Sequence, residues 1–504
     1  MKNTIELILD LEAKLNKEGA FNSEKLLQIW PLFRVKLFME TQVSGENDII
    51  FQIKNGKISF RIIKIAMAIV KELVIDWNNN ASLKKCDIFF STSSANRLVR
   101  QQGKALNAFV SPLYHWFNEQ KKNVRISIEE YPGLGEFRFP RDIPTKYCGI
   151  RSMFVFVISR IFKIPIDEDA KSFFEKVKGY VDELGGNSSP VEIRNVQRTY
   201  SYFVWATRYY THLFKRIRPK IVCVPYYYST LGMAMLCAAN RSDIKTVDIQ
   251  HGVQGKYHVA YGQWPTPPYY GYELLPKIFW CWDNADVENI RSWADGKHIA
   301  IEGGNVWNQY VAVQGSRFPF PQELEEKIRK SDRSIIILVT LQPFLLNLEF
   351  YDLFQSIVDA SVEKEANNIF WLIRMHPLMF SEEAKLLERV GHVKDRIEIS
   401  LSSRAPLLRM LDRSHLHVTI SSSVVLEAEK QGVRSLSVSK KLTYYESQQR
   451  AGTLLLINNG ETLLTGIKRA LKLPLEKKEN IQSPDQAIKA VKYLLQQAML
   501  INAQ

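Results

Sequence analysis

The sequence predicts an α/β protein in which two doubly wound domains face a cleft, with extra helices at the N-terminus and one helix at the C-terminus. Three observations support this fold class. The chain of 504 residues is longer than one hydrophobic core usually serves. From residue 220 onward, short β-rich runs alternate with helical segments, which is typical of βαβ units and parallel sheets. The proline-rich run at 318–321 divides this alternation into two series and predicts a hinge.

The first domain is expected to span residues 1–312. Apolar residues near helical spacing predict helices in 1–40 and 59–77, and an aromatic segment predicts a long helix over 197–216. The expected strands cover 86–91, 124–130, 220–225, 245–250, 277–282 and 298–302, and the expected helices between them cover 229–240 and 284–294. The first strand leads into a run of Ser, Thr and Asn residues, which is typical of the edge at which such a sheet binds ligands.

The second domain is expected to span residues 322–480. Its expected strands cover 334–340, 368–374, 397–400, 416–420 and 435–438, and its expected helices cover 348–365, 405–411 and 423–431. Residues 481–504 are expected to form a C-terminal helix that packs back on the first domain. Ser483 and Pro484 mark its start, because Ser favours the N-cap and Pro the first helical position.

The charge of the chain indicates an anionic partner. Lys and Arg number 67 against 53 Asp and Glu, which gives a net charge of +14. This excess favours nucleotide diphosphates, lipid phosphates, an acidic glycan or the inner membrane surface, although a solvated basic surface explains it equally well. The sequence has no zinc-finger spacing, basic-leucine repeat or RNP-like motif, so nucleic acid is not an expected partner.

The cysteines and the hydropathy pattern bear on the location of the protein. The five cysteines are scattered and form no CxxC pair, so neither a disulfide framework nor a structural zinc site is expected. No window approaches the roughly 20 apolar residues that a membrane span needs, and the N-terminus lacks the features of a signal peptide. We therefore expect a cytoplasmic protein, with peripheral association with the inner membrane as an alternative.

Three motifs follow expected strands and carry groups that can bind phosphate or move a proton. In Asp248-Ile-Gln-His-Gly, the imidazole of His251 can act as a base or steady a phosphate, and Gly252 suits a sharp turn. In Arg374-Met-His-Pro, Arg374 and His376 supply donors for phosphate. The alternative for each motif is a residue that only ends its strand.

The third motif, Thr-Ile-Ser421-Ser422-Ser423-Val-Val-Leu-Glu427, brings three hydroxyls to the start of a helix. The free N–H groups there favour an anion, so Ser421, Ser422 and Ser423 are expected to contact a phosphate. They could equally serve only as the N-cap. For Glu427 the sequence does not decide between two roles, which are binding a ribose hydroxyl and capping its own helix.

Aromatic residues between the first two motifs predict an acceptor wall, because ring faces pack on sugar C–H groups and the polar tips bond to hydroxyls. The alternative is an ordered loop that packs against Trp280 and Trp282. The candidate acceptor-binding residues are His258, Tyr261 and Trp264 in this loop, and Tyr228, which follows the expected strand 220–225 and faces the same cleft.

The order of the three motifs resembles that of bacterial capsule and cell-wall transferases with the GT-B fold of two Rossmann-like domains. The similar groups are the sialyltransferases, the Kdo transferases and the CDP-glycerol glycerophosphotransferases, over roughly residues 220–440. The resemblance implies that Arg374, His376 and Ser421–Ser423 hold the phosphates of a nucleotide-activated donor. It also implies that no metal or other cofactor takes part, in line with the lack of a suitably placed Asp-x-Asp motif.

The catalytic base is where the sequence departs from these families. Sialyltransferases of this kind use an acidic pair followed by Gly, and here two residues separate Glu129-Glu130 from Gly133. The glycerophosphotransferases have Trp before the His-Gly pair, and here Gln250 takes that place. The base is therefore His251 or Glu130, with His251 preferred.

The resemblance implies a glycosyltransferase that moves a sugar from a CMP- or other nucleotide-sugar donor to a capsule, O-antigen or lipopolysaccharide glycan, by a metal-independent and inverting reaction. The expected partners are the nucleotide sugar and a glycan or lipid-linked glycan acceptor. The alternatives are a polyol or sugar phosphotransferase of the CDP-glycerol type, a nucleotide-sugar 2-epimerase, and a non-catalytic protein that binds or exports polysaccharide. A retaining reaction would instead use Glu129, Glu130 or Asp248 as nucleophile.

Overall fold

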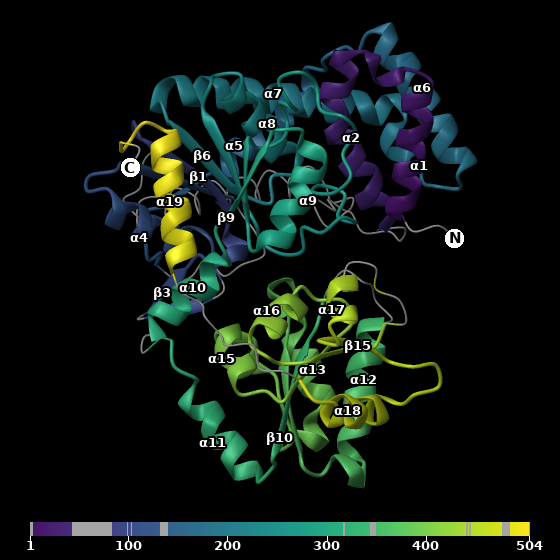
Figure 1. Ribbon diagram of the computed structural model, residues 1–504, viewed down its shortest axis with the longest axis vertical. Helices are drawn as coiled ribbons and strands as arrows, with labels where there is room; N and C mark the ends of the chain where they lie inside the picture. Colours follow the sequence, from purple (N-terminus) through teal and green to yellow (C-terminus); the bar gives the residue numbers. More distant parts are fainter. Residues whose placement is uncertain are drawn as a thin grey trace, which may run out of the picture.

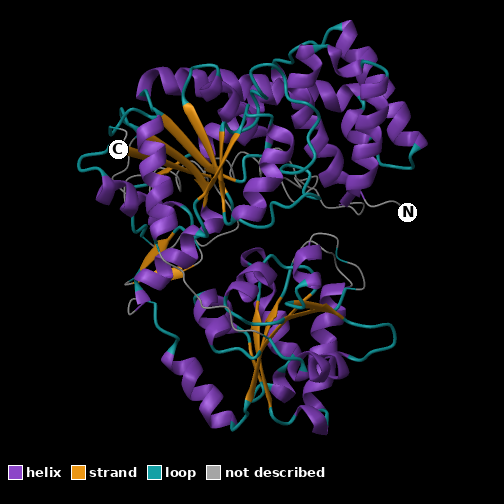
Figure 2. Cartoon of the chain, in the orientation of Figure 1, coloured by secondary structure: helices purple, strands orange, loops and turns teal. Residues whose placement is uncertain are grey.

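A computed structural model describes residues 4–42, 83–97, 99–101, 103–131, 140–315, 318–342, 349–439, 442, 445–475 and 484–502. The chain forms two α/β domains, drawn one above the other in Figure 1, each built on a parallel sheet. Figure 2 shows helices flanking the strands of both sheets. The predicted fold class is confirmed. The helix expected over 59–77 lies outside the described residues.

The first sheet has seven parallel strands in the order β5-β4-β1-β6-β7-β8-β9. The direction in which successive strands are added to the sheet reverses between β1 and β6. Ligands of doubly wound sheets usually bind beside this point. Short runs of Val, Ile and Phe form these strands because both faces are covered by helices. Their bounds are β1 (Ile88–Ser93), β4 (Ile126–Tyr131), β5 (Lys146–Tyr147), β6 (Ile221–Pro225), β7 (Lys245–Ile249), β8 (Ile278–Cys281) and β9 (Ile299–Glu302).

The second sheet has six parallel strands in the order β12-β11-β10-β13-β14-β15 and reverses between β10 and β13. Its strands are β10 (Ile335–Thr340), β11 (Ile369–Arg374), β12 (Ile397–Glu398), β13 (Leu416–Thr419), β14 (Ser435–Ser437) and β15 (Leu454–Leu456). A separate antiparallel pair, β2 (Val99–Gln101) and β3 (Lys104–Leu106), follows β1. The sequence did not predict β2, β3, β5 or β15, all of which are three residues or shorter.

The first domain carries most of the helices. They are α1 (Thr4–Lys17), α2 (Glu24–Gln42), α4 (Val110–Gln120), α5 (Gly149–Ile161), α6 (Glu168–Glu183), α7 (Ile193–Ile217), α8 (Thr230–Asn240), α9 (Asn284–Ala294) and α10 (Val306–Val313). The single segment expected over 1–40 is two helices. Gly19 ends the first of them in the left-handed region at φ 69°, and a short 3-10 turn precedes α2. The helices α4, α5, α6 and α10 were not predicted.

The second domain has shorter helices, which are α11 (Gln322–Ser331), α12 (Glu349–Val362), α13 (Glu383–Arg389), α14 (Ser400–Arg404), α15 (Leu407–Asp412), α16 (Val424–Lys430), α17 (Glu446–Arg450) and α18 (Leu463–Lys472). The last helix, α19 (Asp485–Gln497), lies against the first domain instead. Its Val491, Leu494 and Leu495 belong to the same buried cluster as Trp116 of α4. The backbone N–H of Ala487 donates to Gln309 Oε1 of α10 at 3.2 Å.

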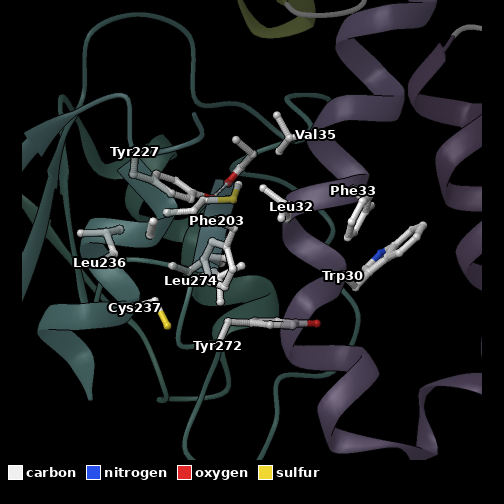
Figure 3. Close-up of a cluster of buried hydrophobic side chains, with 14 of the residues drawn as sticks. Trp30, Leu32, Phe33, Val35, Phe203, Tyr227, Leu236, Cys237, Tyr272 and Leu274 are labelled. Carbon is white, nitrogen blue, oxygen red and sulfur yellow. Dashed lines mark hydrogen bonds between the residues drawn. The ribbon is translucent and has the colours of Figure 1, made fainter. Parts of the chain in front are cut away.

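The N-terminal helices are part of the first domain's core. Figure 3 shows Leu32 and Val35 of α2 directed toward Phe203 and neighbouring buried side chains of the Rossmann-like domain, while Trp30 and Phe33 lie on another side of the helix. Those two rings meet Phe173 and Phe174 of α6 at centroid distances of 6.1 and 4.4 Å. Because α2 is buried on two sides, α1, α2 and α6 are joined rigidly to the sheet.

Candidate active site

The first and third motifs meet across the domain boundary. The His251-Gly252 turn follows β7, and Ser421–Ser423 follow β13. A Cβ atom placed on Gly252 would lie 3.7 Å from Cβ of Ser423. The next residue, Val253, packs against the buried cluster that contains Val425 and Tyr445 of the second domain. Two motifs about 170 residues apart in the sequence therefore lie side by side.

His251 lies among aromatic side chains at the center of this site. Its Nε2 is 3.2 Å from the hydroxyl oxygen of Tyr228, and its ring meets Tyr226 edge to face at 4.9 Å. The buried Nδ1 has no hydrogen-bond partner. Burial lowers the pKa of His251 to about 4, so the imidazole is neutral at pH 7. A neutral imidazole with an unpaired ring nitrogen can accept a proton from a ligand, or donate one to it, depending on its tautomer.

Gln250 fixes the turn that carries His251. Its side chain is fully buried, and Nε2 donates to Gly252 O and to Asp286 Oδ2, both at 2.7 Å. Its Oε1 accepts from the backbone N–H of Trp282 at 2.5 Å, and its backbone oxygen accepts from the Trp282 indole at 3.1 Å. No local pattern in the sequence predicts this role of Gln250. The amide holds the loop after β7 against the loop after β8.

Asp248 points into the core of the first domain. It accepts hydrogen bonds from the Tyr227 backbone and the Tyr261 hydroxyl, both at 2.9 Å, and from Gln254 at 3.3 Å. Burial raises its pKa to about 7. The carboxyl group therefore orders the residues around His251 and has no exposed surface for a substrate.

The acidic pair on β4 is buried and fully engaged. Glu130 forms ion pairs with Arg97 Nε at 2.5 Å and with Arg141 Nη2 at 2.7 Å. Glu129 accepts from Ser91, Tyr131 and Tyr210, and burial raises its pKa. Strands β1 and β6 lie between β4 and β7, so Glu130 and His251 are separated by roughly 14 Å of sheet. The structure does not bring the two candidate bases together. Gly133 lies outside the described residues.

Arg374 places a cation at the carboxyl end of the sheet of the second domain. It ends β11, and its Nη1 donates to the backbone oxygens of Ser402 and Ala405 at 3.0 and 2.6 Å. Among the described residues, nothing accepts from its Nε or Nη2. Burial lowers its pKa to about 10, which leaves the guanidinium charged at pH 7. His376 follows, and burial, aided by Arg374, lowers the pKa of its imidazole to about 4.

The serine run is ordered by Gln342, which lies outside the three motifs. Gln342, just after β10, accepts from both the N–H and the hydroxyl of Ser421 at 3.1 Å through Oε1. Ser422 donates its backbone N–H to Thr419 Oγ1 at 3.2 Å. Ser423 immediately precedes α16 but makes no side-chain cap, and that helix has only seven residues. Its dipole is therefore short, and charge at this edge comes mainly from Arg374.

Glu427 makes a contact that neither expectation included. It accepts from Asn308 Nδ2 at 3.2 Å and Asn305 Nδ2 at 3.4 Å, and both asparagines belong to the first domain. Burial raises the pKa of Glu427 to about 6. Three residues further along α16, Lys430 pairs with Asp283 of the first domain at 3.3 Å. One face of α16 therefore joins the two domains beside the site.

The four candidate acceptor residues fall into two groups. The ring of Tyr228 lies 5.9 Å from that of His251, and the ring of His258 lies 5.5 Å from that of Tyr228. Tyr261 and Trp264 are 0% and 5% exposed, and their polar atoms donate to Asp248 and to Ala260 O. Their burial favours the alternative of a packed loop for these two residues. The neighbouring Trp280 and Trp282 are also buried.

Arg34 of α2 holds the same loop from the other side. Its guanidinium is fully buried, lies 4.2 Å from the ring centroid of Trp264, and donates to Gln263 O at 2.9 Å. Its Nε pairs with Glu12 of α1 at 2.8 Å. The N-terminal helices thus support the loop that carries His258. All five cysteines are buried and free, and within the described ranges no group of three or more His, Cys, Asp or Glu could hold a metal ion.

Comparison with solved structures identifies the class of fold. The chain matches the structure of S. aureus MnaA with UDP at a TM-score of 0.51 and 12% identity, covering 84% of this chain and 98% of that one. It also matches Methanocaldococcus jannaschii UDP-GlcNAc 2-epimerase with UDP-GlcNAc and UDP at a TM-score of 0.48 and 12% identity, covering 81% and 99%. No protein-family model and no curated protein matches the sequence. The protein is a two-domain α/β protein with the GT-B arrangement of Rossmann-like domains.

Proposed function

We propose that the protein is a metal-independent, inverting glycosyltransferase that moves a sugar from a nucleotide-activated donor to a surface glycan such as capsule, O-antigen or lipopolysaccharide. The contact between the His251-Gly252 turn and Ser423 is the observation that carries this proposal. It joins a proton-accepting group of one domain to the phosphate-binding candidates of the other, at the edges where doubly wound sheets bind ligands.

His251 is the proposed base. Its low pKa of about 4 keeps the imidazole neutral at pH 7, and its unpaired Nδ1 is available to a bound ligand. Tyr228 fixes the ring through Nε2. Glu130 is a weaker candidate because both of its carboxylate oxygens are already in ion pairs with arginines. These contacts support the preference for His251 over Glu130.

The proposed donor site uses the uncommitted Nε and Nη2 groups of Arg374, together with His376 and the Ser421–Ser423 run. A guanidinium fork suits two phosphate oxygens, and its buried position strengthens the attraction. Tyr228 and His258 are the residues proposed to contact the acceptor, since Tyr228 contacts His251 and His258 contacts Tyr228.

In the proposed reaction His251 accepts the proton of an acceptor hydroxyl, and the hydroxyl oxygen forms a bond to the anomeric carbon of the donor. The bond between that carbon and the phosphate oxygen breaks, and the nucleotide leaves with the electron pair. Arg374 stabilises the negative charge that develops on the phosphate. A single displacement of this kind inverts the anomeric center.

Nucleotide binding tests the donor half of the proposal. We expect one of CMP, CDP, UDP, GDP and dTDP to raise the melting temperature clearly, with UDP included because it is bound in S. aureus MnaA. Arg374→Ala should abolish the shift, whereas Arg404→Ala, an exposed arginine paired with Glu383, should retain it. The absence of a shift with every nucleotide would favour a non-catalytic polysaccharide-binding protein.

Product analysis tests the reaction. With the preferred nucleotide sugar and a glycan acceptor, we expect the sugar to appear in the glycan without phosphorus. Phosphorus in the product would instead identify a phosphotransferase of the CDP-glycerol type. Conversion of the nucleotide sugar into its C2 epimer in the absence of acceptor would identify an epimerase.

A further inference from the structure

The outer face of α5 exposes large apolar side chains together. Phe154 is 63% exposed, Val157 43%, Ile161 66%, and Phe162, just after the helix, 59%. The first three are spaced by three and four residues, so they lie on one face of the helix. Single exposed apolar residues are ordinary, but a contiguous group of this kind marks an interaction surface.

Uncompensated cations surround this face. The helices α5 and α7, which pack against each other, contain no Asp or Glu. Within the part of the chain that the structure describes, no carboxylate pairs with Arg160, Lys163, Arg198 or Arg208. The pKa of Arg160 is lowered first by burial and then by Arg198, so these two guanidinium groups repel each other. These two helices are therefore basic along their own lengths, which favours an anionic partner.

The basic surface continues along α7, which crosses the upper part of the first domain in Figure 1. Trp205 donates its indole N–H to Phe162 O at 2.8 Å, and the guanidinium of Arg208 lies 4.8 Å from its ring centroid. Beyond this ridge lies a cavity of about 890 Å³ between α2 and α7, whose lining includes Arg208, His212 and Lys215 of α7 together with Glu24 and Glu273. Aromatic and cationic groups are thus adjacent over α5 and α7.

We propose that the outer face of α5 and the adjoining ridge of α7 dock on an anionic lipid bilayer. The four apolar side chains would enter the interfacial region. The cations that would face lipid phosphates are Arg160, Lys163, Arg198 and Arg208. An amphipathic helix with both features binds membranes through burial of apolar area and through electrostatic attraction. No helix among the described residues is long and apolar enough to span a membrane.

Charge favours a bilayer over a second copy of the chain. A twofold dimer through this face would place two acid-free, basic helix pairs against each other, because such an interface uses the same patch twice. Like charges in that position repel, whereas anionic lipids supply negative charge and an apolar interior together. This proposal rests on the surface of α5 and α7 and does not depend on the proposed transferase activity.

Vesicle sedimentation with the full chain tests the proposal. The probes are phosphatidylcholine vesicles with and without phosphatidylglycerol. We expect binding to the anionic vesicles only, and weakening in high salt. The triple variant Phe154→Ser, Ile161→Ser, Phe162→Ser and the double variant Arg160→Ser, Lys163→Ser should each reduce the partition coefficient by on the order of tenfold or more.

The matched control is Leu387→Ser with Leu473→Ser, which removes two exposed leucines, 43% and 44% exposed, from the second domain. It should bind vesicles like the wild type. All substituted residues are exposed, so melting temperatures should change little. Equal binding by all variants, or no binding by the wild type, would overturn the proposal. So would a wild-type dimer that the triple variant converts to monomer in light scattering, since a second copy would then cover this face.

Discussion

The hydroxyl of Tyr228 lies 3.2 Å from Nε2 of His251, while Nδ1 of the same ring is buried without a hydrogen-bond partner. The imidazole is thus held by one nitrogen and leaves the other for a ligand. This asymmetry separates two effects that mutagenesis can measure, the proton transfer itself and the orientation of the ring.

His251→Ala should lower kcat by about 10²- to 10⁴-fold, the range for loss of a general base. Tyr228→Phe retains the ring but removes one hydrogen bond, and should cost only about tenfold. Steady-state kinetics of sugar transfer is the measurement. His392→Ala, at an exposed position in the second domain, is the control and should match the wild type. A His251→Ala enzyme with full activity would exclude His251 as the base.

The pH dependence of kcat/KM should reveal the burial of His251. As the proposed base, His251 must be neutral, and burial lowers its pKa to about 4 because the charged form loses hydration. We therefore expect activity to persist below pH 6.5 and to fall only as the pH approaches 4. The profile should be measured where the melting curve shows that the enzyme remains folded. An acid limb near pH 6.5 would point to a solvated histidine instead.

The contact of Glu427 with Asn305 and Asn308 should favour the arrangement in which the two domains meet. Substitution of both asparagines by Ala removes two hydrogen bonds to a carboxylate and should shift the domain equilibrium toward separation by roughly tenfold or more. Small-angle X-ray scattering would report a larger radius of gyration. Asn367→Ala, away from this contact, should scatter like the wild type. An unchanged radius in the double variant would show that other contacts hold the domains.

The Arg34–Glu12 pair should be a strong determinant of stability. Arg34→Met leaves the Glu12 carboxylate buried without its cation and should reduce the free energy of unfolding by about 3–5 kcal/mol. The double variant Arg34→Met, Glu12→Gln should lose less, because no unpaired charge remains. Urea denaturation measures both. Lys14→Met breaks an exposed pair with Glu183 and should cost about 0.5 kcal/mol or less. Equal losses in the single and double variants would contradict the role of the unpaired charge.

Much of the sheet topology was predictable because buried parallel strands are local apolar runs. The helix α9 (Asn284–Ala294) matches the expected range of 284–294, and its capping Asp283 is a local signal. The helix α5 was missed since apolar residues lie on both its buried and exposed faces, which blurs the helical period. A surface helix is usually recognised in a sequence by its polar outer face, and α5 does not have one.

The candidate site was predictable where it depends on strand ends, and not where it depends on distant partners. His251, Arg374 and the serines each follow a strong apolar strand. The ion pairs of Glu130 depend on arginines at 97 and 141, and the burial of Trp264 depends on Arg34, 230 residues earlier. No local pattern encodes such contacts. The roles of Gln250 and Gln342 were missed for the same reason.

The position of α19 has a mechanical consequence. The chain leaves the first domain after α10, builds the second domain, and returns so that α19 packs beside α4 and β9. The chain therefore connects the two domains at two points, once after α10 and once before α19. We expect such a double connection to restrict the relative motion of the two domains more than a single linker would. Opening and closing should follow a single reproducible path, and removal of α19 would free the second domain to swivel while exposing apolar surface on the first.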